Sequence, residues 1–300
     1  MGLAMAGRLL DRGHQLQLYN RTAANASPLV ARGARLCASP RVACAGVEAV
    51  IAMVADDVAS RSVWLGADGI LAGRAGRAAR AVGAAGDAGA AAQCLAVECS
   101  TLSHGWVLEL AARARAAGLR YVDSPVTGLP DAARAGTLTL LVGADGADLA
   151  AARALLEALS ASIIHFGPVG SGTAYKLIIN LVGAIQIASV AEGLAIAGSA
   201  GLDLALVAEA IAASQAASPQ VVRNTRRMVA ADHDRDVVFS GALRLKDVEY
   251  AVRYAQECGI GSPFGAVAQR LYRELSARGD GALNESRIIE VARAQPPEDS

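Results

Sequence analysis

The stretch that decides the fold is GSGTAYKLIIN, residues 170–180, in which a glycine-rich turn opens a long apolar helix. Lys176 and Asn180 are four residues apart, so they share one face of that helix. No charged residue occurs from Leu177 to Ala191, which predicts a helix buried on most sides. A lysine at the start of such a helix either reaches solvent or keeps its charge at a cost in free energy. Lys176 is therefore a candidate catalytic residue.

The composition describes a globular chain with room for two domains. Its 300 residues are 53% hydrophobic, and 28 basic residues balance 28 acidic ones. Such a balance indicates neither a nucleic-acid partner nor an anionic membrane. The uncharged run between Lys176 and Glu192 is shorter than a bilayer span, which favours a core helix.

Cysteine and histidine usage bounds the metal and redox chemistry. The five cysteines form no CxxC pair and the four histidines are scattered, so neither a metal site nor a disulfide framework is predicted. The N-terminus lacks the basic and apolar pattern of a secretory signal. These features favour a cytoplasmic protein.

The first half of the chain alternates β-like runs with alanine-rich helical stretches, which is typical of a parallel sheet covered by helices. The predicted strands are Gln15 to Tyr19, Ala49 to Val54, Leu95 to Glu98, Arg120 to Asp123, Thr137 to Val142 and Ile163 to Phe166. Helices are predicted at Leu3 to Asp11 and Val107 to Ala117, ended by Gly13 and Gly118. Only helical patterns follow residue 167. The sequence therefore predicts an α/β domain over residues 1–167 and an all-α domain over residues 168–300.

Two segments fit neither domain. Residues 73–93 are almost entirely Ala, Gly and Arg, which predicts a low-complexity surface loop of unassigned role. The tail from Gln295 to Ser300 is expected to be disordered.

The N-terminal residues resemble the second half of a dinucleotide-binding β-α-β unit. Gly2 precedes a helix whose N-terminus would receive a pyrophosphate, and a strand then ends in Asn20, Arg21 and Thr22. An acidic residue at that strand end would hold a ribose hydroxyl, whereas Asn20, Arg21 and Thr22 suit a 2′-phosphate. This favours NADP over NAD, with a solvated turn and an incidental arginine as the alternative.

The strand that should precede this helix is absent from the sequence, together with the first glycines of the phosphate loop. Its loss would leave strand edges unpaired at the centre of the sheet. We therefore expect a truncated N-terminal domain, with the true start upstream of Met1 in preference to an inactive product.

Several further motifs make the chain resemble the β-hydroxyacid dehydrogenase family, which includes 3-hydroxyisobutyrate dehydrogenase and tartronate semialdehyde reductase. That family's G-x-G-x-x-x-K-x-x-x-N pattern is matched in full by the stretch at residues 170–180. The other matched segments are Met1-Gly2, Met53 to Asp57, Ser100-Thr101, Asp123 to Leu129, Ala135 to Leu138, and Lys246-Asp247. The resemblance covers nearly the whole chain and implies a Rossmann-like N-terminal domain.

The resemblance implies a role for each matched side chain. The hydroxyl of Thr127 and the backbone around Gly128 would bind the carboxylate of a small hydroxy acid or semialdehyde. Lys176 would move the hydroxyl proton during hydride transfer, which requires its pKa to fall from about 10.4 to roughly 7 to 8. Asn180 would hold Lys176 or the substrate oxygen, unless it is only a satisfied core amide. Lys246 would approach the cofactor, unless it lies on a solvated helix surface.

The remaining cofactor contacts come from loops. The resemblance places Val54 and Ala55 in the loop after the third strand of the unit and Thr101 in the loop after the next. Together with Gly2 and residues 20–22, these residues form the predicted binding site for a nicotinamide cofactor.

The sequence departs from the family pattern at a few positions. Thr127 replaces a serine and Leu129 replaces a second glycine, so the substrate preference stays open among hydroxyisobutyrate, tartronate semialdehyde and succinic semialdehyde. Ile179 stands where the related 6-phosphogluconate dehydrogenases have histidine, which argues against a sugar-phosphate substrate.

The same residues leave two rival functions open. An imine reductase shares the architecture but commonly lacks the lysine, so Lys176 argues against it. A non-catalytic binding protein would have kept the fold and lost the cofactor. The apolar second domain suggests a homodimer or homotetramer.

Overall fold

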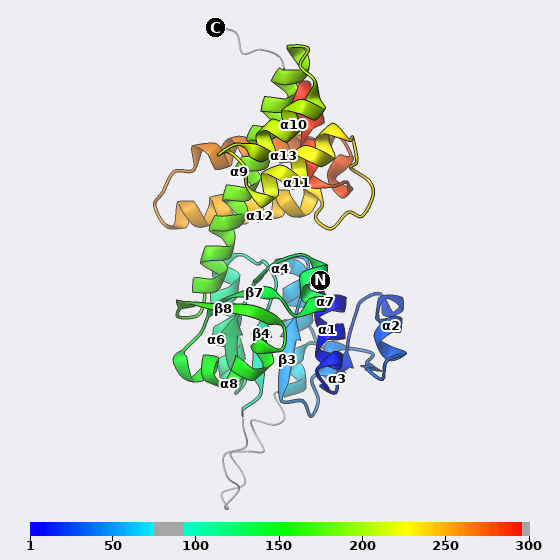
Figure 1. The fold of residues 1–300 in the computed structure, drawn as a ribbon. Coiled ribbons are helices and arrows are strands. Elements are labelled where there is room, and N and C mark those ends of the chain that lie inside the picture. The colour runs from blue at the N-terminus through cyan, green and yellow to red at the C-terminus, as the bar shows by residue number, and fades with distance from the viewer. Residues whose placement is uncertain (75–92, 296–300) are drawn as a thin grey trace, which may run out of the picture. The chain divides into compact units, whose positions relative to one another are not determined.

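The computed structural model describes residues 1–74 and 93–295, and it divides the chain into two compact units, residues 1–176 and 177–300 (Figure 1). The first unit combines helices with two sheets, and in the described part of the second unit only helices and one isolated β-bridge occur. The predicted combination of an α/β Rossmann-like domain with an all-α domain is confirmed.

The strands of the first unit form a six-stranded and a two-stranded sheet. Their bounds are β1 Gln17–Leu18, β2 Arg35–Leu36, β3 Ala49–Ala52, β4 Leu95–Glu98, β5 Arg120–Asp123, β6 Val126–Thr127, β7 Leu138–Gly143 and β8 Ser160–Gly167. The larger sheet has the order β3-β4-β5-β7-β6, with β8 beside β7, whereas β1 and β2 pair with each other. Strands β3, β4 and β5 are parallel, so their carboxyl ends meet at one edge.

The predicted strands match these bounds unevenly. Strands β4 and β5 have the predicted limits, and β8 begins three residues before the predicted Ile163. Strands β2 and β6 were not predicted, because two residues are too few for an alternating pattern. The short strand β1 pairs with β2 alone among the described strands, and β3 pairs with β4 alone, so the two sheets remain separate.

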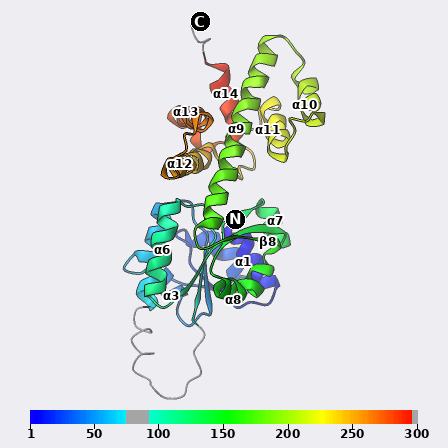
Figure 2. The ribbon, with the colours of Figure 1, turned by 90° about the vertical axis from the view of Figure 1, so that its left-hand side faces the viewer.

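Helices cover both faces of the larger sheet (Figure 2). They are α1 Gly2–Asp11, α2 Ser27–Val30, α3 Pro40–Ala43, α4 Asp57–Leu65, α6 His104–Ala116, α7 Pro130–Ala135 and α8 Gly146–Glu157, with a 3-10 turn at Ala23–Ala26. Alternate strand residues face opposite layers: Val97 packs with α1 and α8, whereas the neighbouring Ala96 packs with α4 and α6. The predicted stops of α1 and α6 are confirmed, since Gly13 and Gly118 adopt φ of 84° and 78°.

Helix α9, Ser171–Ser199, begins in the first unit, and the second unit is built around the part of it that follows Lys176. The other helices are α10 Leu204–Ala213, α11 Pro219–Val229, α12 Gly241–Glu257, α13 Pro263–Ala277 and α14 Ile288–Arg293, with 3-10 turns η2 Asp280–Ala282 and η3 Glu285–Arg287. Side chains of α9 such as Ile187, Ala191 and Leu194 form one core with α11, α12, α13 and α14.

Helix α9 is longer than the uncharged run of its sequence suggested. It runs for 29 residues, which by length and composition alone is enough to cross a membrane, and among the described helices it alone meets that test. The sequence suggested a shorter element, because Glu192 ends the uncharged run without ending the helix. Leu177, Ile187 and Leu194 are fully buried, but only 44% of its most apolar window is buried, so one face of α9 lies in the core and the rest is exposed.

Two glycines seat the first turn of α9 on the sheet. Gly170 adopts a φ of 94°, which L side chains rarely adopt. A Cβ atom on Gly172 would lie 2.1 Å from the carbonyl oxygen of Leu141 in β7. Gly143, at the end of β7, is equally constrained, because its Cβ would lie 2.9 Å from the amide nitrogens of Ser171 and Gly172. The glycine-rich turn therefore serves close backbone packing.

Two segments for which the sequence made a prediction lie mostly outside the residues that the structure describes. The low-complexity loop at residues 73–93 is described only at Gly73, Arg74 and Gln93, and the tail at 295–300 only at Gln295.

Replacing Gly172 by alanine should destabilise the protein by about 1–3 kcal/mol, because the new methyl group has no room against β7. Gly105 is the matched control: it is also the second residue of its helix, and a Cβ there meets nothing within 4 Å. Chemical denaturation of both variants measures the difference. Equal stability of the Gly172→Ala and Gly105→Ala variants would show that α9 is not seated as described.

Candidate active site

Asp123 anchors the helix turn that carries Lys176. It ends β5 and is fully buried, and its carboxylate accepts the Thr173 N–H at 2.8 Å and the Thr173 Oγ1–H at 2.6 Å. Burial raises the pKa of Asp123 to about 7, against the opposing hydrogen bonds from Thr173. Lys176 follows Thr173 by three residues, so these bonds fix the part of α9 from which its half-buried side chain extends.

Thr127 and Gly128 lie on the strand and turn that follow Asp123. Thr127 ends β6 opposite Thr139 of β7 and is partly exposed. Gly128 adopts a φ of 123°, and a Cβ there would lie 2.8 Å from Cδ2 of the buried Leu138. A glycine is therefore required here both by the backbone conformation and by the close packing of Leu138 and Ala132.

The loops after β3 and β4 are tied together by hydrogen bonds. The Val54 N–H donates to Ser100 Oγ at 2.8 Å, and the Ser100 N–H donates to a carboxylate oxygen of Glu98 at 3.0 Å. Glu98 is fully buried and also accepts from Trp64 and Ser60. Burial raises its pKa, against these hydrogen bonds.

The same two loops are joined a second time, around Asp57 at the start of α4. Its carboxylate accepts the Ser103 N–H at 2.9 Å and the Ser103 hydroxyl at 2.5 Å. Ala55 and Thr101 stand in these two loops, at the carboxyl ends of adjacent parallel strands. That edge is where ligands bind in open α/β sheets.

Two of the three predicted phosphate-selecting residues, Asn20 and Arg21, line a hollow in the surface. Asn20, Arg21 and Thr22 follow β1 and are exposed, and the Thr22 N–H donates to Asn20 Oδ1 at 3.0 Å. A hollow of about 370 Å³ is lined by Tyr19, Asn20, Arg21, Ala23, Leu36, Cys37 and Ala38. Gly2 lies separately, at the N-terminus of α1 beside Met53. The exposed guanidinium in an open hollow has the chemistry to hold a phosphate.

In the second unit, the side chain of Asn180 is bound to Asp247, which also pairs with Lys246. Asn180 Nδ2 donates to Asp247 Oδ2 at 2.6 Å, and Lys246 Nζ lies 2.9 Å from Asp247 Oδ1. A carboxylate only accepts hydrogen bonds, so Asp247 fixes which way the amide of Asn180 points. The Asn180 Oδ1 atom is thereby left as an acceptor for a ligand or an ammonium group.

The structure therefore joins the predicted site residues within each unit. Val54 and Thr101 stand in linked loops, and Asn180 connects with Lys246 through Asp247. Lys176 follows by three residues the Thr173 that is bound to Asp123, and Thr127 follows Asp123 by four. Sequence patterns did not predict that Glu98, Arg244 and Glu285 would be buried hydrogen-bond partners of the site. Their isolated charges look like surface residues until the fold buries them.

The stability of the fold should depend on pH through Asp123. Because the folded state raises its pKa from 3.8 to about 7, the folded state binds the proton more tightly than the unfolded state, and stability falls as the pH rises from about 4 to about 7. The loss is at most about 4 kcal/mol. An Asp123→Asn variant should lack this component: its amide oxygen can accept the Thr173 N–H, and its NH2 group can donate to Thr173 Oγ1. Urea denaturation at pH 5 and pH 8 measures it, and parallel pH curves for parent and variant would contradict the assignment.

Comparison with known proteins places both units in one family. Residues 1–167 match the model of the NAD binding domain of 6-phosphogluconate dehydrogenase. Residues 170–292 match the model of the NAD-binding region of NADP-dependent 3-hydroxyisobutyrate dehydrogenase.

Curated and solved relatives agree with the family models. An NAD-dependent L-serine dehydrogenase of Pseudomonas aeruginosa is 32% identical, over 93% of this chain and 90% of the relative. A 3-hydroxyisobutyrate dehydrogenase of the same organism is 31% identical, over 93% and 90%. The solved 3-hydroxyisobutyrate dehydrogenase of Mycobacterium tuberculosis with L-serine is 27% identical, with a TM-score of 0.81 over 98% of this chain and 96% of that one. The chain belongs to the β-hydroxyacid dehydrogenase family, whose members use a nicotinamide cofactor to act on hydroxy acids.

Proposed function

We propose that this protein interconverts a small 3-hydroxy acid and its semialdehyde, with Lys176 as the general acid and base. The observation that carries the proposal is the anchored first turn of α9. Asp123 holds Thr173 at the end of the sheet, Lys176 follows by three residues, and Asn180 follows on the same helix face with its amide fixed by Asp247. A lysine and an oriented amide on one helix face supply a proton carrier and a group to aim it.

The residues present fit a dinucleotide cofactor. The open hollow beside Arg21 suits the phosphorylated ribose, and the linked loops carrying Val54, Ala55 and Thr101 stand at the sheet edge where such ligands bind. Gly2 lies at a helix N-terminus, where backbone N–H groups favour a phosphate. The bound cofactor supplies the hydride acceptor or donor, and Lys246 is a further proposed cofactor contact.

The substrate carboxylate is proposed to bind the Thr127 hydroxyl and the backbone at Gly128. Both relatives described above act on short 3-hydroxy acids, L-serine and 3-hydroxyisobutyrate, so these are the first substrates to assay. Leu129, which is 39% exposed beside Gly128, adds bulk where the family pattern has glycine. This narrows the space for a branched substituent.

Lys176 is proposed to take the hydroxyl proton in the oxidation and to return it to the carbonyl oxygen in the reduction. A neutral amine is needed for the first step and an ammonium for the second, so its pKa must lie near the working pH. Asn180 Oδ1 is the acceptor that aims the Lys176 ammonium or the substrate hydroxyl.

Replacing Lys176 by alanine should lower kcat by about 10²- to 10⁴-fold, because the proton carrier is lost. The Kd for NADPH should stay within about twofold, since cofactor contacts come from other loops. The Lys176→Arg variant is the control for charge: it keeps a cation but cannot act as a base, so it should be as inactive as the alanine variant. Steady-state kinetics with fluorescence titration of the cofactor tests this. Parent-like turnover by either variant rejects the assignment.

The cofactor is proposed to be NADP in preference to NAD, with Arg21 holding the 2′-phosphate. Replacing Arg21 by glutamine should weaken NADPH binding by about 3- to 30-fold and leave NADH binding unchanged, because a charge-assisted bond at an exposed site is lost. An Arg12→Gln variant, which removes another exposed charge of the same unit, is the control. Nicotinamide fluorescence titrations measure both affinities, and equal losses for NADPH and NADH would refute selection by Arg21.

Two rival functions are separated by the same assays. An imine reductase would turn over cyclic imines, and its activity would not need Lys176. The presence of this lysine on an anchored turn argues against that alternative. A non-catalytic binding protein would bind a cofactor or a hydroxy acid without turnover.

The protein is also proposed to be a cytoplasmic homodimer or homotetramer. None of the residues of the apolar helix α10 is buried, and Ile196, Leu202 and Leu206 are 63%, 56% and 64% exposed. Covering this apolar surface by a second copy would remove it from water. Sedimentation velocity tests the proposal, and a monomer at micromolar concentration would rule it out.

A further inference from the structure

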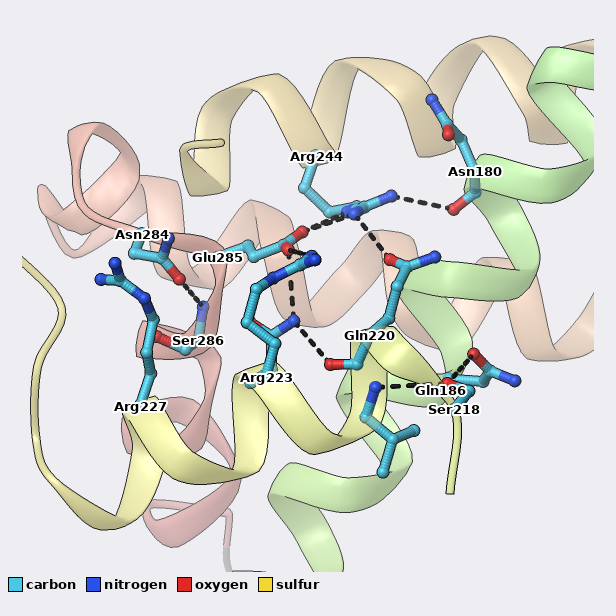
Figure 3. A network of polar contacts seen from close by, with 12 residues as sticks. Asn180, Gln186, Ser218, Gln220, Arg223, Arg227, Arg244, Asn284, Glu285 and Ser286 are labelled. Carbon is cyan, nitrogen blue, oxygen red and sulfur yellow. Dashed lines mark hydrogen bonds and ion pairs between the residues drawn. The ribbon is translucent and has the colours of Figure 1, made fainter. Parts of the chain in front are cut away.

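The second unit buries an arginine whose guanidinium is held on several sides (Figure 3). Arg244 in α12 is 4% exposed, and its Nε donates to Glu285 Oε2 at 2.6 Å. One terminal nitrogen donates to Gln220 Oε1 at 3.3 Å, and the other donates to the backbone carbonyl of Asn180 at 3.1 Å. The cation therefore links η3, α11 and α9.

Helix α12 contacts Asn180 twice. Arg244 and Asp247 are three residues apart on one helix face, and they reach the main chain and the side chain of Asn180 respectively. The Arg244 bond fixes where the backbone of this turn lies, and the Asp247 bond fixes how its amide is turned. Together they determine the position of the Asn180 Oδ1 atom.

Helix α9 is shaped to admit this arrangement. Gly183 lies three residues after Asn180, and a Cβ there would lie 2.5 Å from Gln220 Nε2. The glycine lets Gln220 lie against the helix, where its oxygen meets Arg244. Glu285, which is 1% exposed, also receives Asn224 Nδ2 at 3.3 Å and has Arg223 at 3.5 Å.

A buried ion pair is a costly way to gain stability alone. Removing two charges from water offsets much of their attraction, so well-packed apolar side chains in their place often stabilise a fold as well or better. The Arg244–Glu285 pair places its cation against the one carbonyl that belongs to Asn180. What the buried pair contributes is therefore a fixed position for the backbone at Asn180.

We infer that Arg244, held by Glu285 and Gln220, is a positioning residue for Asn180 and through it for the proton transfer by Lys176. The inference rests on the proposed function for its kinetic consequence. Its structural part, that Arg244 fixes the α9 turn at Asn180, stands on the contacts within the second unit.

The test separates stability from positioning. Arg244→Met alone takes from the buried Glu285 its 2.6 Å bond to Arg244 and leaves it only the longer contacts with Arg223 and Asn224, so the melting temperature of this variant should fall. The Arg244→Met/Glu285→Leu double variant removes both charges, and its melting temperature should return to within about 5 °C of the parent. The matched control is Arg273→Met/Glu249→Leu, which removes an ion pair between α13 and α12 that has no contact with Asn180.

Two readouts then decide the inference. In the charge-free double variant, kcat should remain about 10-fold or more below the parent, with the KM for the cofactor unchanged, and the pH profile of kcat should shift because Asn180 no longer aims Lys176. Hydrogen exchange of the α9 segment around Asn180 should be faster than in the parent. The control variant should match the parent in both.

Recovery of kcat, pH profile and exchange together with stability would overturn the inference and leave the pair a purely structural one. If the parent itself has no dehydrogenase activity, the proposed function fails, and the exchange measurement alone still decides whether Arg244 fixes the turn. Unchanged exchange in that case rejects the inference as well.

Discussion

The hydrogen bonds between the buried carboxylate of Asp123 and the first turn of α9 are the constraint on which the site depends. They join the end of β5 to Thr173, three residues before Lys176. Gly172 brings the same turn against β7, since only a residue without a side chain fits between the helix and that strand. A lysine on a freely moving helix end could not be aimed at a reacting oxygen, whereas a turn fixed at two strands can carry it there.

The loops after β3 and β4 are likewise fixed by carboxylates, the fully buried Glu98 and the partly buried Asp57. Glu98 holds Ser100, which holds Val54, and Asp57 holds Ser103. Buried carboxylates satisfied by backbone N–H groups are costly to remove but rigid once formed. In the first unit, these carboxylates thus fix the shape of the loops where a dinucleotide is proposed to bind. The second unit uses Arg244 and Asp247 on Asn180 in the same way.

Local signals predicted most of the fold, and tertiary contacts explain what they missed. Strands β4 and β5 have the predicted limits because their apolar runs are buried on both faces, whereas the two-residue strands β2 and β6 carry too little pattern. The G-x-G turn pointed to α9, but Glu192 hid the full length of that helix. Glu98, Arg244 and Glu285 stand singly in the sequence. Only the packing of distant segments brings Trp64 and Ser60 to Glu98, and Glu285 and Asn180 to Arg244. The family resemblance named Lys176 and Asn180 as site residues, while the bond from Asn180 to Asp247 needed the structure.

The account requires a hydride to leave the carbinol carbon of a small 3-hydroxy acid. The most direct measurement incubates the purified protein with NADP and with L-serine or 3-hydroxyisobutyrate carrying deuterium on that carbon, and follows the label by NMR. The account predicts reduced cofactor with deuterium at C4 of the nicotinamide ring. Reduced cofactor without label, or no reduction with either acid while NADPH binds tightly, would contradict it.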